Sequence, residues 1–245
     1  MSGEVQISQD FILSSLGCAF QVSTGTLLLA DLHIGYEVVL EGDGFAMPRY
    51  QTEEMLSRID LAIDRYDPSI VVVDGDFKHN FDRNLSAEWR DVEKMVDRIT
   101  SRSKLVVIRG NHDNYLATIL ARKGMHLRKE AVMGNVKILH GHETSTPWQG
   151  GMVFGHEHPA LTLREKTGAS VKVPCFLYDK EENRLVLPAF SPLATGSDII
   201  RTPDEERMIP LLSQTGVDQY IAYGFFKDQI LNYQSIGELR SIGKL

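Results

Sequence analysis

Five apolar runs, each ending in Asp, His or Asn, constrain the fold of this chain more than any other sequence feature. The clearest is LVVIRGNHD at residues 105–113, where a run rich in Val and Ile stops at a glycine turn. Such a run is typical of a buried strand, and α/β sheets bind their ligands at strand ends. The other four are TLLLADLH (26–33), IVVVDGD (70–76), VKILH (136–140) and MVFGHEH (152–158). Because all five end alike, we expect the rim of one sheet to converge on a single site.

The first half of the chain alternates strand and helix patterns. A hairpin is predicted from residues 11–22 and 26–30, joined near residues 23–25, and residues 35–47, which contain three glycines, are predicted to be a loop. Helical spacing of apolar residues then predicts helices over 48–66, 86–102 and 114–123. This alternation of strands and helices predicts βαβ units and a largely parallel sheet.

After Gly124 the pattern changes to short strands separated by turns, which predicts a mainly antiparallel or mixed second half packed on the first. Residues 193–216 are rich in Pro, Gly, Ser and Thr and are expected to form an irregular excursion. Residues 217–245 return to strand-like alternation and are expected to close the sheet. No feature marks a second domain, so residues 1–245 are predicted to form one α/β domain.

The net charge, the cysteines and the N-terminal residues limit the kind of protein that this chain can be. The chain has 245 residues and a formal net charge of -7, which excludes a general basic coat for gripping long nucleic acid. Cys18 and Cys175 lie far apart without a C-x-x-C motif, which favours two buried free thiols in a reducing cytoplasm. The apolar stretch at residues 11–20 is preceded by acidic residues and interrupted by Ser and Gly, so we expect neither a signal peptide nor contact with a membrane.

Several of the polar residues at the strand ends are spaced as metal ligands. Asp31 and His33 are two positions apart, so both side chains point to the same side and can reach one metal. His156 and His158 repeat this spacing. Asp76 follows a buried strand, and its carboxylate has two oxygens that can bridge two cations.

The GNHD segment separates a ligand from a proton donor. Asn111 offers a neutral amide oxygen, and the adjacent His112 must face a different direction. His140 ends its own strand, with His142 as a competing candidate two residues later. Any one of these residues could be an incidental turn residue, but their placement at separate strand ends indicates a shared metal site.

Taken together, Asp31-x-His33, Gly75-Asp76, Gly110-Asn111-His112-Asp113, His140-Gly141 and Gly155-His156-x-His158 resemble the five-motif signature of the calcineurin-like metallophosphoesterases. The forms GDFKH, GNHD, LHGHE and GHEHPA are most similar to the small archaeal and bacterial branch of standalone or DNA-ligase-associated phosphoesterases. The resemblance implies a four-layer αββα sandwich with mixed central sheets and two metal ions at the strand ends.

The resemblance also implies a role for each motif residue. It assigns the first metal to Asp31, His33 and His158, the second to Asn111, His140 and His156, and the bridging position to Asp76. It makes His112 the general acid or a phosphate contact, oriented by Asp113 or another carboxylate, and Asn111 also faces the substrate.

The Gly-Asp motif departs from the family pattern three positions after its Asp. An acidic or amide residue is common there, and this chain has His79. We expect His79 to contact a substrate phosphate, because Lys78 is beside it. His142 is expected to lie behind the ligands or in solvent.

The implied activity is hydrolysis of phosphodiesters by in-line attack of a hydroxide that bridges two divalent metals. Nitrogen and oxygen ligands without thiolate fit Mn²⁺, Ni²⁺, Fe²⁺ or Zn²⁺, and the resemblance favours Mn²⁺. The alternatives are a nuclease acting on DNA or RNA ends, a cyclic-nucleotide phosphodiesterase and a phosphomonoesterase. A non-catalytic scaffold of the same fold is disfavoured because all seven ligand positions are filled.

The expected partner is a phosphate ester, such as a nucleotide or a short nucleic-acid end. A basic cluster follows the GNHD motif and comprises Arg122, Lys123, Arg128 and Lys129. It could bind the phosphates of the substrate or form a solvated face, and Tyr115 and Trp148 could stack on bases. Residues 193–216 could act as a lid, a substrate selector or a homodimer contact.

Overall fold

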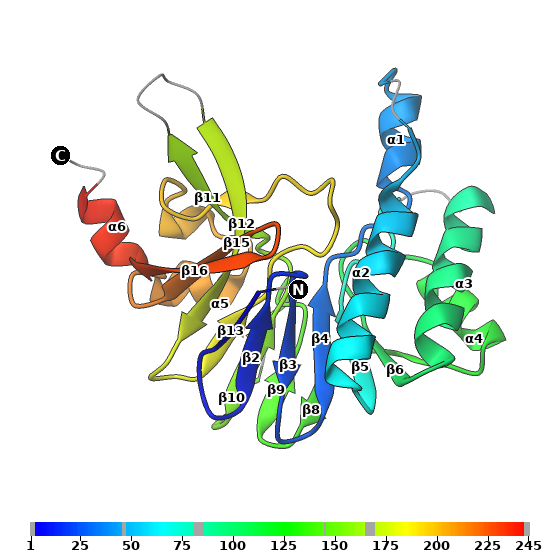
Figure 1. The fold of residues 1–245 in the computed structure, drawn as a ribbon, viewed down its shortest axis with the longest axis horizontal. Helices are drawn as coiled ribbons and strands as arrows, with labels where there is room; N and C mark the ends of the chain where they lie inside the picture. Colours follow the sequence, from blue (N-terminus) through cyan, green and yellow to red (C-terminus); the bar gives the residue numbers. More distant parts are fainter. Residues whose placement is uncertain (1–2, 46–47, 81–85, 145, 165–169, 243–245) are drawn as a thin grey trace.

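The computed structural model describes residues 3–45, 48–80, 86–144, 146–164 and 170–242. Two β-sheets pack face to face, and the larger helices lie along the outer side of the first sheet (Figure 1). This arrangement agrees with the α/β sandwich predicted from the sequence.

The strands of the first sheet lie in chain order from β1 to β7. Its strands are β1 (Glu4–Gln6), β2 (Phe11–Ser14), β3 (Cys18–Gln21), β4 (Thr26–Ala30), β5 (Ile70–Asp74), β6 (Lys104–Ile108) and β7 (Leu127–Arg128). The pairs from β1 to β4 are antiparallel, and those from β4 to β7 are parallel. Ala30, Asp74 and Ile108 are in register, so β4, β5 and β6 end side by side and their following loops meet at one edge.

Alternating side chains of these strands serve two different cores. The helices α1 (Tyr36–Gly42), α2 (Gln51–Tyr66), α3 (Ser86–Thr100) and α4 (Leu116–Arg122) belong to the first half. Leu29 and Val73 pack in the cluster that contains the apolar faces of α2 and α3. Leu28 and Val72 point the other way and pack against the second sheet, as the period of two along a strand requires.

The second sheet is mixed, as expected. Its central order is β14-β11-β12-β13-β10-β9-β8, with β15 paired to β12 and β16 to β15. The strands are β8 (Ala131–Met133), β9 (Val136–Ile138), β10 (Gly151–Phe154), β11 (Pro159–Arg164), β12 (Ser170–Asp179), β13 (Arg184–Val186), β14 (Ser197–Asp198), β15 (Ile221–Phe226) and β16 (Gln229–Ser235). The pairs β9–β10, β10–β13 and β11–β14 are parallel.

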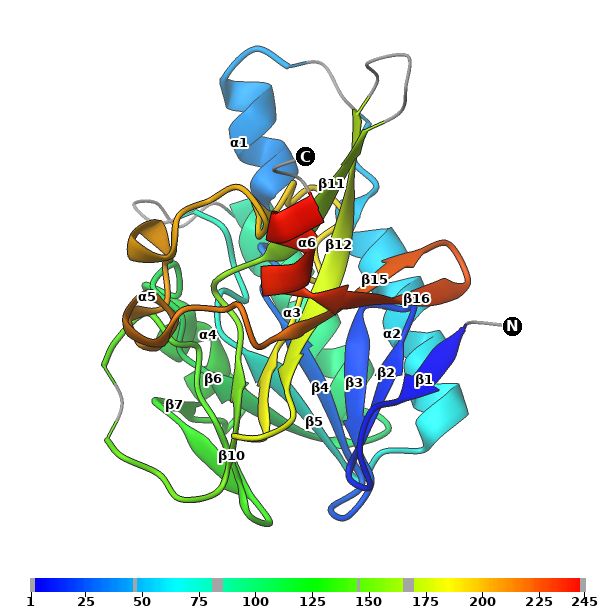
Figure 2. The ribbon, with the colours of Figure 1, turned by 90° about the vertical axis from the view of Figure 1, so that its left-hand side faces the viewer.

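A thin layer covers the outer face of the second sheet and completes the αββα order. It contains the 3-10 turn η1 (Asp204–Glu206) and the short helices α5 (Pro210–Thr215) and α6 (Ile236–Ile242). Leu212 and Ile236 pack there with Phe154 and Leu177 of the sheet. Both views show α1 and the β11–β12 pair projecting from the same end of the sandwich (Figure 2).

The structure differs from the sequence predictions at several element ends. The run 11–22 is two strands, because Gly17, with φ +79°, allows a tight turn after Ser14. The segment predicted as a loop at 35–47 contains α1, and the next helix begins at Gln51 instead of Pro48. Glu37 of α1 accounts for that start, because its carboxylate accepts the backbone N–H groups of Tyr50 and Gln51 at 2.6 and 2.5 Å.

The C-terminal third also differs in detail. Residues 193–216, expected to be irregular, contain β14, η1 and α5 separated by turns, and α6 follows the two closing strands. These elements are two to seven residues long, which is too short for hydrophobic periodicity to identify. Among the described helices, none is both long and apolar enough to cross a membrane.

Candidate metal centre

The seven side chains expected to bind metal meet at one end of the sandwich. Asp31, Asp76 and Asn111 follow β4, β5 and β6 of the first sheet, and His140 and His156 follow β9 and β10 of the second. His33 and His158 lie two residues beyond Asp31 and His156. The site therefore lies where the ends of both sheets come together, and the expectation that the rim of one sheet carries all five motifs was wrong.

Asp31, His33 and His158 form one group whose possible ligand atoms all lie within 4.8 Å of one another. Nε2 of His158 lies 3.2 Å from Oδ1 of Asp31 and 3.3 Å from Nε2 of His33. Atoms bound at about 2.1 Å to one tetrahedral ion are separated by roughly 3.4 Å. The spacing in this group therefore fits a shared cation.

Asp76, His140 and His156 form a second group that meets the same 4.8 Å criterion. Nε2 of His140 lies 3.4 Å from Oδ2 of Asp76 and 3.3 Å from Oδ1 of Asn111. The same Oδ2 of Asp76 lies 3.8 Å from Nε2 of His33, a member of the first group. Asp76 is thus in contact with both groups.

The backbone at this site is strained. Asp31, His33, Asp76, His156 and His158 have φ values of +57°, +46°, +43°, +63° and +45°. L-residues adopt this left-handed region at a cost of about 1–2 kcal/mol each, and such residues cluster at functional sites. The fold therefore holds these five side chains in a geometry that local preference would not choose.

Three motif glycines make room for the polar groups. A Cβ at Gly75 would lie 2.0 Å from Nδ1 of His140, and one at Gly110 would lie 2.0 Å from Oδ1 of Asp76. A Cβ at Gly155 would lie 2.8 Å from the carbonyl oxygen of Asp74. A side chain of the site occupies the space at Gly75 and Gly110, and the backbone of Asp74 occupies it at Gly155, so each position accepts only hydrogen.

Buried carboxylates at the centre need positive charge nearby to stabilise their ionised forms. Asp31, Asp74 and Asp76 are at most 2% exposed. Burial alone would raise the pKa of Asp31 and Asp76, but His158 and His140 lie close enough to hold both pKa values below their usual range. Burial dominates at Asp74, whose pKa is raised well above its ordinary value.

The histidines respond to the same environment in opposite ways. Burial lowers the pKa of His33 to about 3 and that of His156 to about 4, so both imidazoles are neutral, as metal ligands must be. Burial also opposes charge on His140, but its hydrogen bond to Asp76 and the charges of Asp31 and Asp76 raise its pKa to about 10. His140 therefore supplies part of the positive charge that this cluster of carboxylates requires.

The donor set fits divalent cations in both chemistry and spacing. Oδ1 of Asp31 is buried and has no hydrogen-bond partner of good geometry in the described structure, although His158 lies beside it. Buried carboxylate oxygens are normally paired or bound to a metal. Neutral imidazoles, an amide oxygen and carboxylates are ligands suited to Mn²⁺, Fe²⁺, Ni²⁺ or Zn²⁺.

His112 and His79 lie next to the first group. The His112 backbone N–H donates to Oδ1 of Asp76 at 2.8 Å, and His112 Nδ1 lies 2.8 Å from the carbonyl oxygen of His79. His79 Nδ1 lies 3.3 Å from Nδ1 of His33, and the His79 ring stacks on Tyr36 with centroids 4.0 Å apart. A carbonyl partner requires the proton on Nδ1 of His112, which leaves Nε2 as the nitrogen suited to proton exchange.

Asp113 and Lys78 have structural roles that the sequence did not indicate. Asp113 accepts the backbone N–H groups of Phe77, Lys78 and Gly110, so its carboxylate joins the two loops. The Lys78 ammonium is fully buried and lies 3.4 Å from Glu88. Lys78 is therefore directed into the protein, and the argument that it assists His79 was wrong.

His142 lies beside the second group. Its ring centroid is 5.2 Å from that of His140 and 5.9 Å from that of His156, and its side chain is 22% exposed. Burial lowers its pKa. His142 is therefore next to two candidate ligands without being a member of either group.

Two positioning residues were missed from the sequence. Buried Gln51 donates its side-chain N–H groups to the carbonyl oxygen of His33 and to Oγ of Ser191, both at 2.9 Å, and thereby fixes the Asp31–His33 loop. Glu157, between two candidate ligands, accepts the N–H groups of Met208 and Ile209 at 3.0 and 3.3 Å. A Gln at a helix start or a Glu between two histidines carries no sequence signal of such a role.

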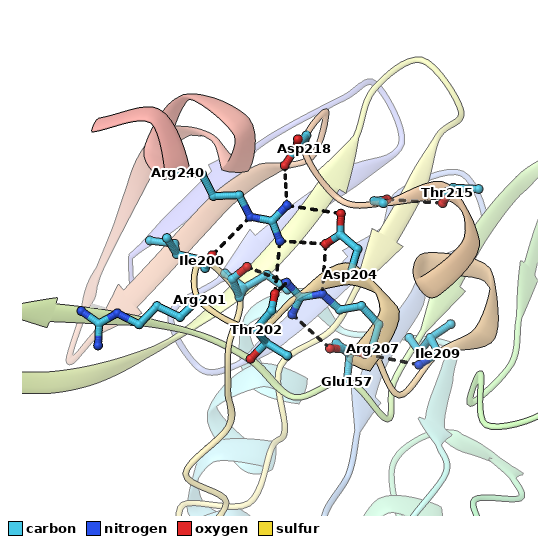
Figure 3. Close-up of polar contacts among 12 residues, drawn as sticks. Glu157, Ile200, Arg201, Thr202, Asp204, Arg207, Ile209, Thr215, Asp218 and Arg240 are labelled. Carbon is cyan, nitrogen blue, oxygen red and sulfur yellow. Dashed lines mark hydrogen bonds and ion pairs between the residues drawn. The ribbon is translucent and has the colours of Figure 1, made fainter. Parts of the chain in front are cut away.

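Glu157 lies between the candidate ligands His156 and His158 in sequence, and Figure 3 shows its contacts with Arg207 and Ile209 of the outer layer. Its carboxylate lies 3.5 Å from Nη1 of Arg207, whose Nη2 donates to the carbonyl oxygens of Ile199 and Thr202. Arg207 also lies 3.5 Å from Asp204, which pairs in turn with Arg240 at 2.7 Å. Segment 199–209 is thereby tied to the turn that carries His156 and His158.

Two members of the basic cluster after GNHD, Arg122 and Lys123, contact α3. Arg122 lies over the ring of Trp89, 4.6 Å from its centroid, and Lys123 pairs with Asp97 at 2.6 Å. Trp89 and Asp97 belong to α3, so both cations pack between helices on the outer side of the first sheet. Tyr115 is 55% exposed, and Lys137 lies over Trp148.

The chain matches one protein family and resembles two solved structures. The family model described as calcineurin-like phosphoesterase matches residues 26–224. The crystal structure of the nuclease MPE of Pseudomonas putida is similar with a TM-score of 0.69 and 23% identity, over 95% of this chain and 100% of that one. A second structure, the phosphoesterase Yfce of E. coli, has a TM-score of 0.39 and 11% identity, over 86% of this chain and 98% of that one. No significant match was found among the curated proteins.

Proposed function

Because the chain belongs to the calcineurin-like phosphoesterase family, whose members are metal-dependent hydrolases of phosphoester bonds, we propose that it is a two-metal phosphodiesterase. The observation that carries this proposal is the position of Asp76. One oxygen of its carboxylate lies 3.4 Å from His140 and 3.8 Å from His33, which belong to different ligand groups. A carboxylate in contact with both groups is what a shared two-metal site requires.

In this proposal Asp31, His33 and His158 would hold one ion, Asn111, His140 and His156 would hold the other, and Asp76 would contribute to both sites. Two divalent ions would supply Lewis acidity and an activated water, and Mn²⁺ is our first choice. Among the chain's own ligands, His33 and His156 are neutral imidazoles that need not lose a proton before binding. His140, whose pKa is raised to about 10, would have to release one.

His112 is proposed as the general acid. Its Nδ1 is oriented by the carbonyl of His79 and its backbone N–H is fixed by Asp76, so the ring is positioned at the edge of the centre. In the protonated form, His112 Nε2 would give a proton to the leaving alkoxide, a contribution of about 10²–10⁴ in rate.

His79 is proposed as a substrate contact beside His112. Burial lowers its pKa to about 4, so it would act as a neutral hydrogen-bond donor. Its stacking on half-exposed Tyr36 would hold the ring in place.

The test is hydrolysis of bis-p-nitrophenyl phosphate beside p-nitrophenyl phosphate after metal removal and separate addition of Mn²⁺, Ni²⁺, Fe²⁺, Zn²⁺ and Mg²⁺. We expect metal-dependent cleavage of the diester that falls by about 10²–10⁴ in His112→Ala. His126 provides the matched control, because it is the exposed histidine outside all five motifs, and His126→Ala should retain wild-type rates.

Cleavage of the monoester alone would move the substrate class to phosphomonoesters. Equal loss in His112→Ala and His126→Ala would exclude the proposed role of His112. If the protein binds metal but cleaves neither ester, the result would contradict a general phosphodiesterase and would favour a non-catalytic scaffold of the same fold.

A further inference from the structure

A cleft of about 590 Å³ opens beside the metal centre. His158, a candidate ligand, lines it together with residues of β12 and of the turn between β15 and β16. The side chain of His158 is 18% exposed, so the centre and the cleft share a boundary. A substrate held by its phosphate at the metals can therefore continue into this space.

The charged side chains that line the cleft are mostly cationic. They are Arg58, Lys172 and Lys227, against the single carboxylate of Glu54. The whole chain has a formal net charge of -7, so the charge of this cleft is opposite in sign to that of the chain as a whole. A cleft lined by one sign of charge attracts ligands of the other sign.

Arg58 is a largely buried cation whose recorded partners are carbonyl groups. Its Nε and Nη2 donate to the carbonyl oxygen of Leu16 at 3.1 and 2.6 Å, and Nη1 donates to that of Phe190 at 2.9 Å. Within the described residues it forms no ion pair with a carboxylate within 4.0 Å. Arg58 therefore adds a fixed positive charge to the wall of the cleft, where Glu54 is the acidic residue that acts on it.

The two lysines are exposed at the mouth of the cleft. Lys172 donates one hydrogen bond, to the carbonyl oxygen of Gly196 at 2.9 Å, and an ammonium group has three donors. Lys227 is held by the turn after β15, where its φ is +55°. Both are suited to phosphate contacts that a small substrate would not reach.

An aromatic surface stands beside these cations. Phe226 is 61% exposed, and Nζ of Lys227 lies 5.5 Å from its ring centroid. Proteins that bind single-stranded nucleic acid combine a positively charged groove with exposed aromatic rings on which bases stack. A base inside a duplex is already stacked and cannot use such a ring.

We infer that this cleft binds the nucleotides that flank the scissile phosphate of a single-stranded polynucleotide. Lys172 and Lys227 face its phosphates, Arg58 adds positive charge from the wall of the cleft, and Phe226 stacks on a base. This inference rests on the proposed phosphodiesterase function and specifies its substrate class. DNA and RNA share the recognised groups, so the experiment includes both.

The test compares kcat/KM for short single-stranded DNA and RNA oligonucleotides with kcat/KM for bis-p-nitrophenyl phosphate, which has no second phosphate. The variants are K172A/K227A and F226A, and the matched control is K104A/K180A, which removes two exposed lysines outside the cleft. We expect the ratio of oligonucleotide to small-diester kcat/KM to fall at least tenfold in K172A/K227A and to stay at the wild-type value in the control.

Binding supplies a second readout that does not depend on turnover. Fluorescence anisotropy of a labelled oligonucleotide, in a His112→Ala background that retains every candidate ligand, should show weaker binding in K172A/K227A. The slope of log K against log salt should fall by about 1.4, because each lost phosphate contact on a single strand is worth about 0.7.

The possible outcomes separate the two proposals. A wild-type enzyme that cleaves the small diester, with equal ratios and salt slopes in K172A/K227A and K104A/K180A, would overturn the cleft assignment alone. An enzyme that cleaves no diester would contradict the proposed function, and the anisotropy would still decide whether the cleft binds single strands. Equal binding of blunt duplex and single strand would also overturn the inference.

Discussion

Gly75 and Gly124 both have left-handed backbone conformations, with φ values of +76° and +67°. They differ in what a side chain would meet. A Cβ at Gly75 would lie 2.0 Å from Nδ1 of His140, whereas nothing lies within 4 Å of a Cβ at Gly124. The pair therefore separates the cost of backbone conformation from the cost of displacing a candidate ligand.

We predict that Gly75→Ala lowers phosphodiesterase kcat/KM by about 10²-fold or more, because a displacement of about 1 Å at a catalytic group has effects of that size. Gly124→Ala should cost about 1–2 kcal/mol of unfolding free energy and retain activity per folded molecule. Steady-state kinetics with urea unfolding of both variants measures this. Equal activity in the two variants would show that the Gly75 contact is unimportant.

At the scale of single residues, the sequence identifies side chains that the fold brings together, but it does not identify the residues that support them. The spacing of Asp31 and His33 follows from the period of a strand, so it could be predicted locally. The contact of Gln51 with the carbonyl oxygen of His33 depends on how α2 packs, and no local pattern encodes it. The same holds for Asp113, whose carboxylate accepts backbone N–H groups from two loops.

At the scale of elements, the outer layer of the second sheet supports the metal centre through one buried ion pair. Glu157 and Arg207 are fifty residues apart in sequence, and their side chains are 1% and 0% exposed. Burial raises the pKa of Glu157, and the charge of Arg207 and the N–H groups of Ile209 and Met208 oppose that rise. Segment 199–209 thus has a structural function that its irregular sequence did not reveal.

We predict that Arg207→Met lowers the unfolding free energy by about 3–5 kcal/mol, because it leaves the Glu157 carboxylate buried without its cation. Arg102→Met provides the control, since Arg102 and Asp64 form an exposed pair at 2.7 Å that should be worth at most about 1 kcal/mol. Urea unfolding gives both values. Similar small losses in the two variants would mean that the buried pair does not stabilise this layer.

The element predictions failed where helices were short or strands were interrupted. The hairpin predicted over 11–30 became three strands, because Gly17 permits a turn inside the first run. Helix α1 was predicted as a loop because it is seven residues long and bounded by glycines. Long periodic elements such as α2 and α3 were predicted to within a few residues.

At the scale of the whole molecule, the order of layers could be predicted because strand and helix patterns alternate and then give way to short strands. What the sequence could not give is the in-register ending of β4, β5 and β6, which brings three motifs to one edge. The position of the second sheet then adds His140, His156 and His158 from the opposite side. The candidate centre is a property of the assembled sandwich.

The measurement that tests the central claim most directly is the number of metal ions bound per chain. Wild-type protein equilibrated with Mn²⁺ and freed of excess metal should contain two ions per chain by inductively coupled plasma mass spectrometry. Asp76→Asn should lose at least one of them, whereas Asp64→Asn, which changes an exposed carboxylate on α2, should retain both. A wild-type chain that binds one ion or none, or an Asp76→Asn chain that keeps both, would contradict the two-metal centre.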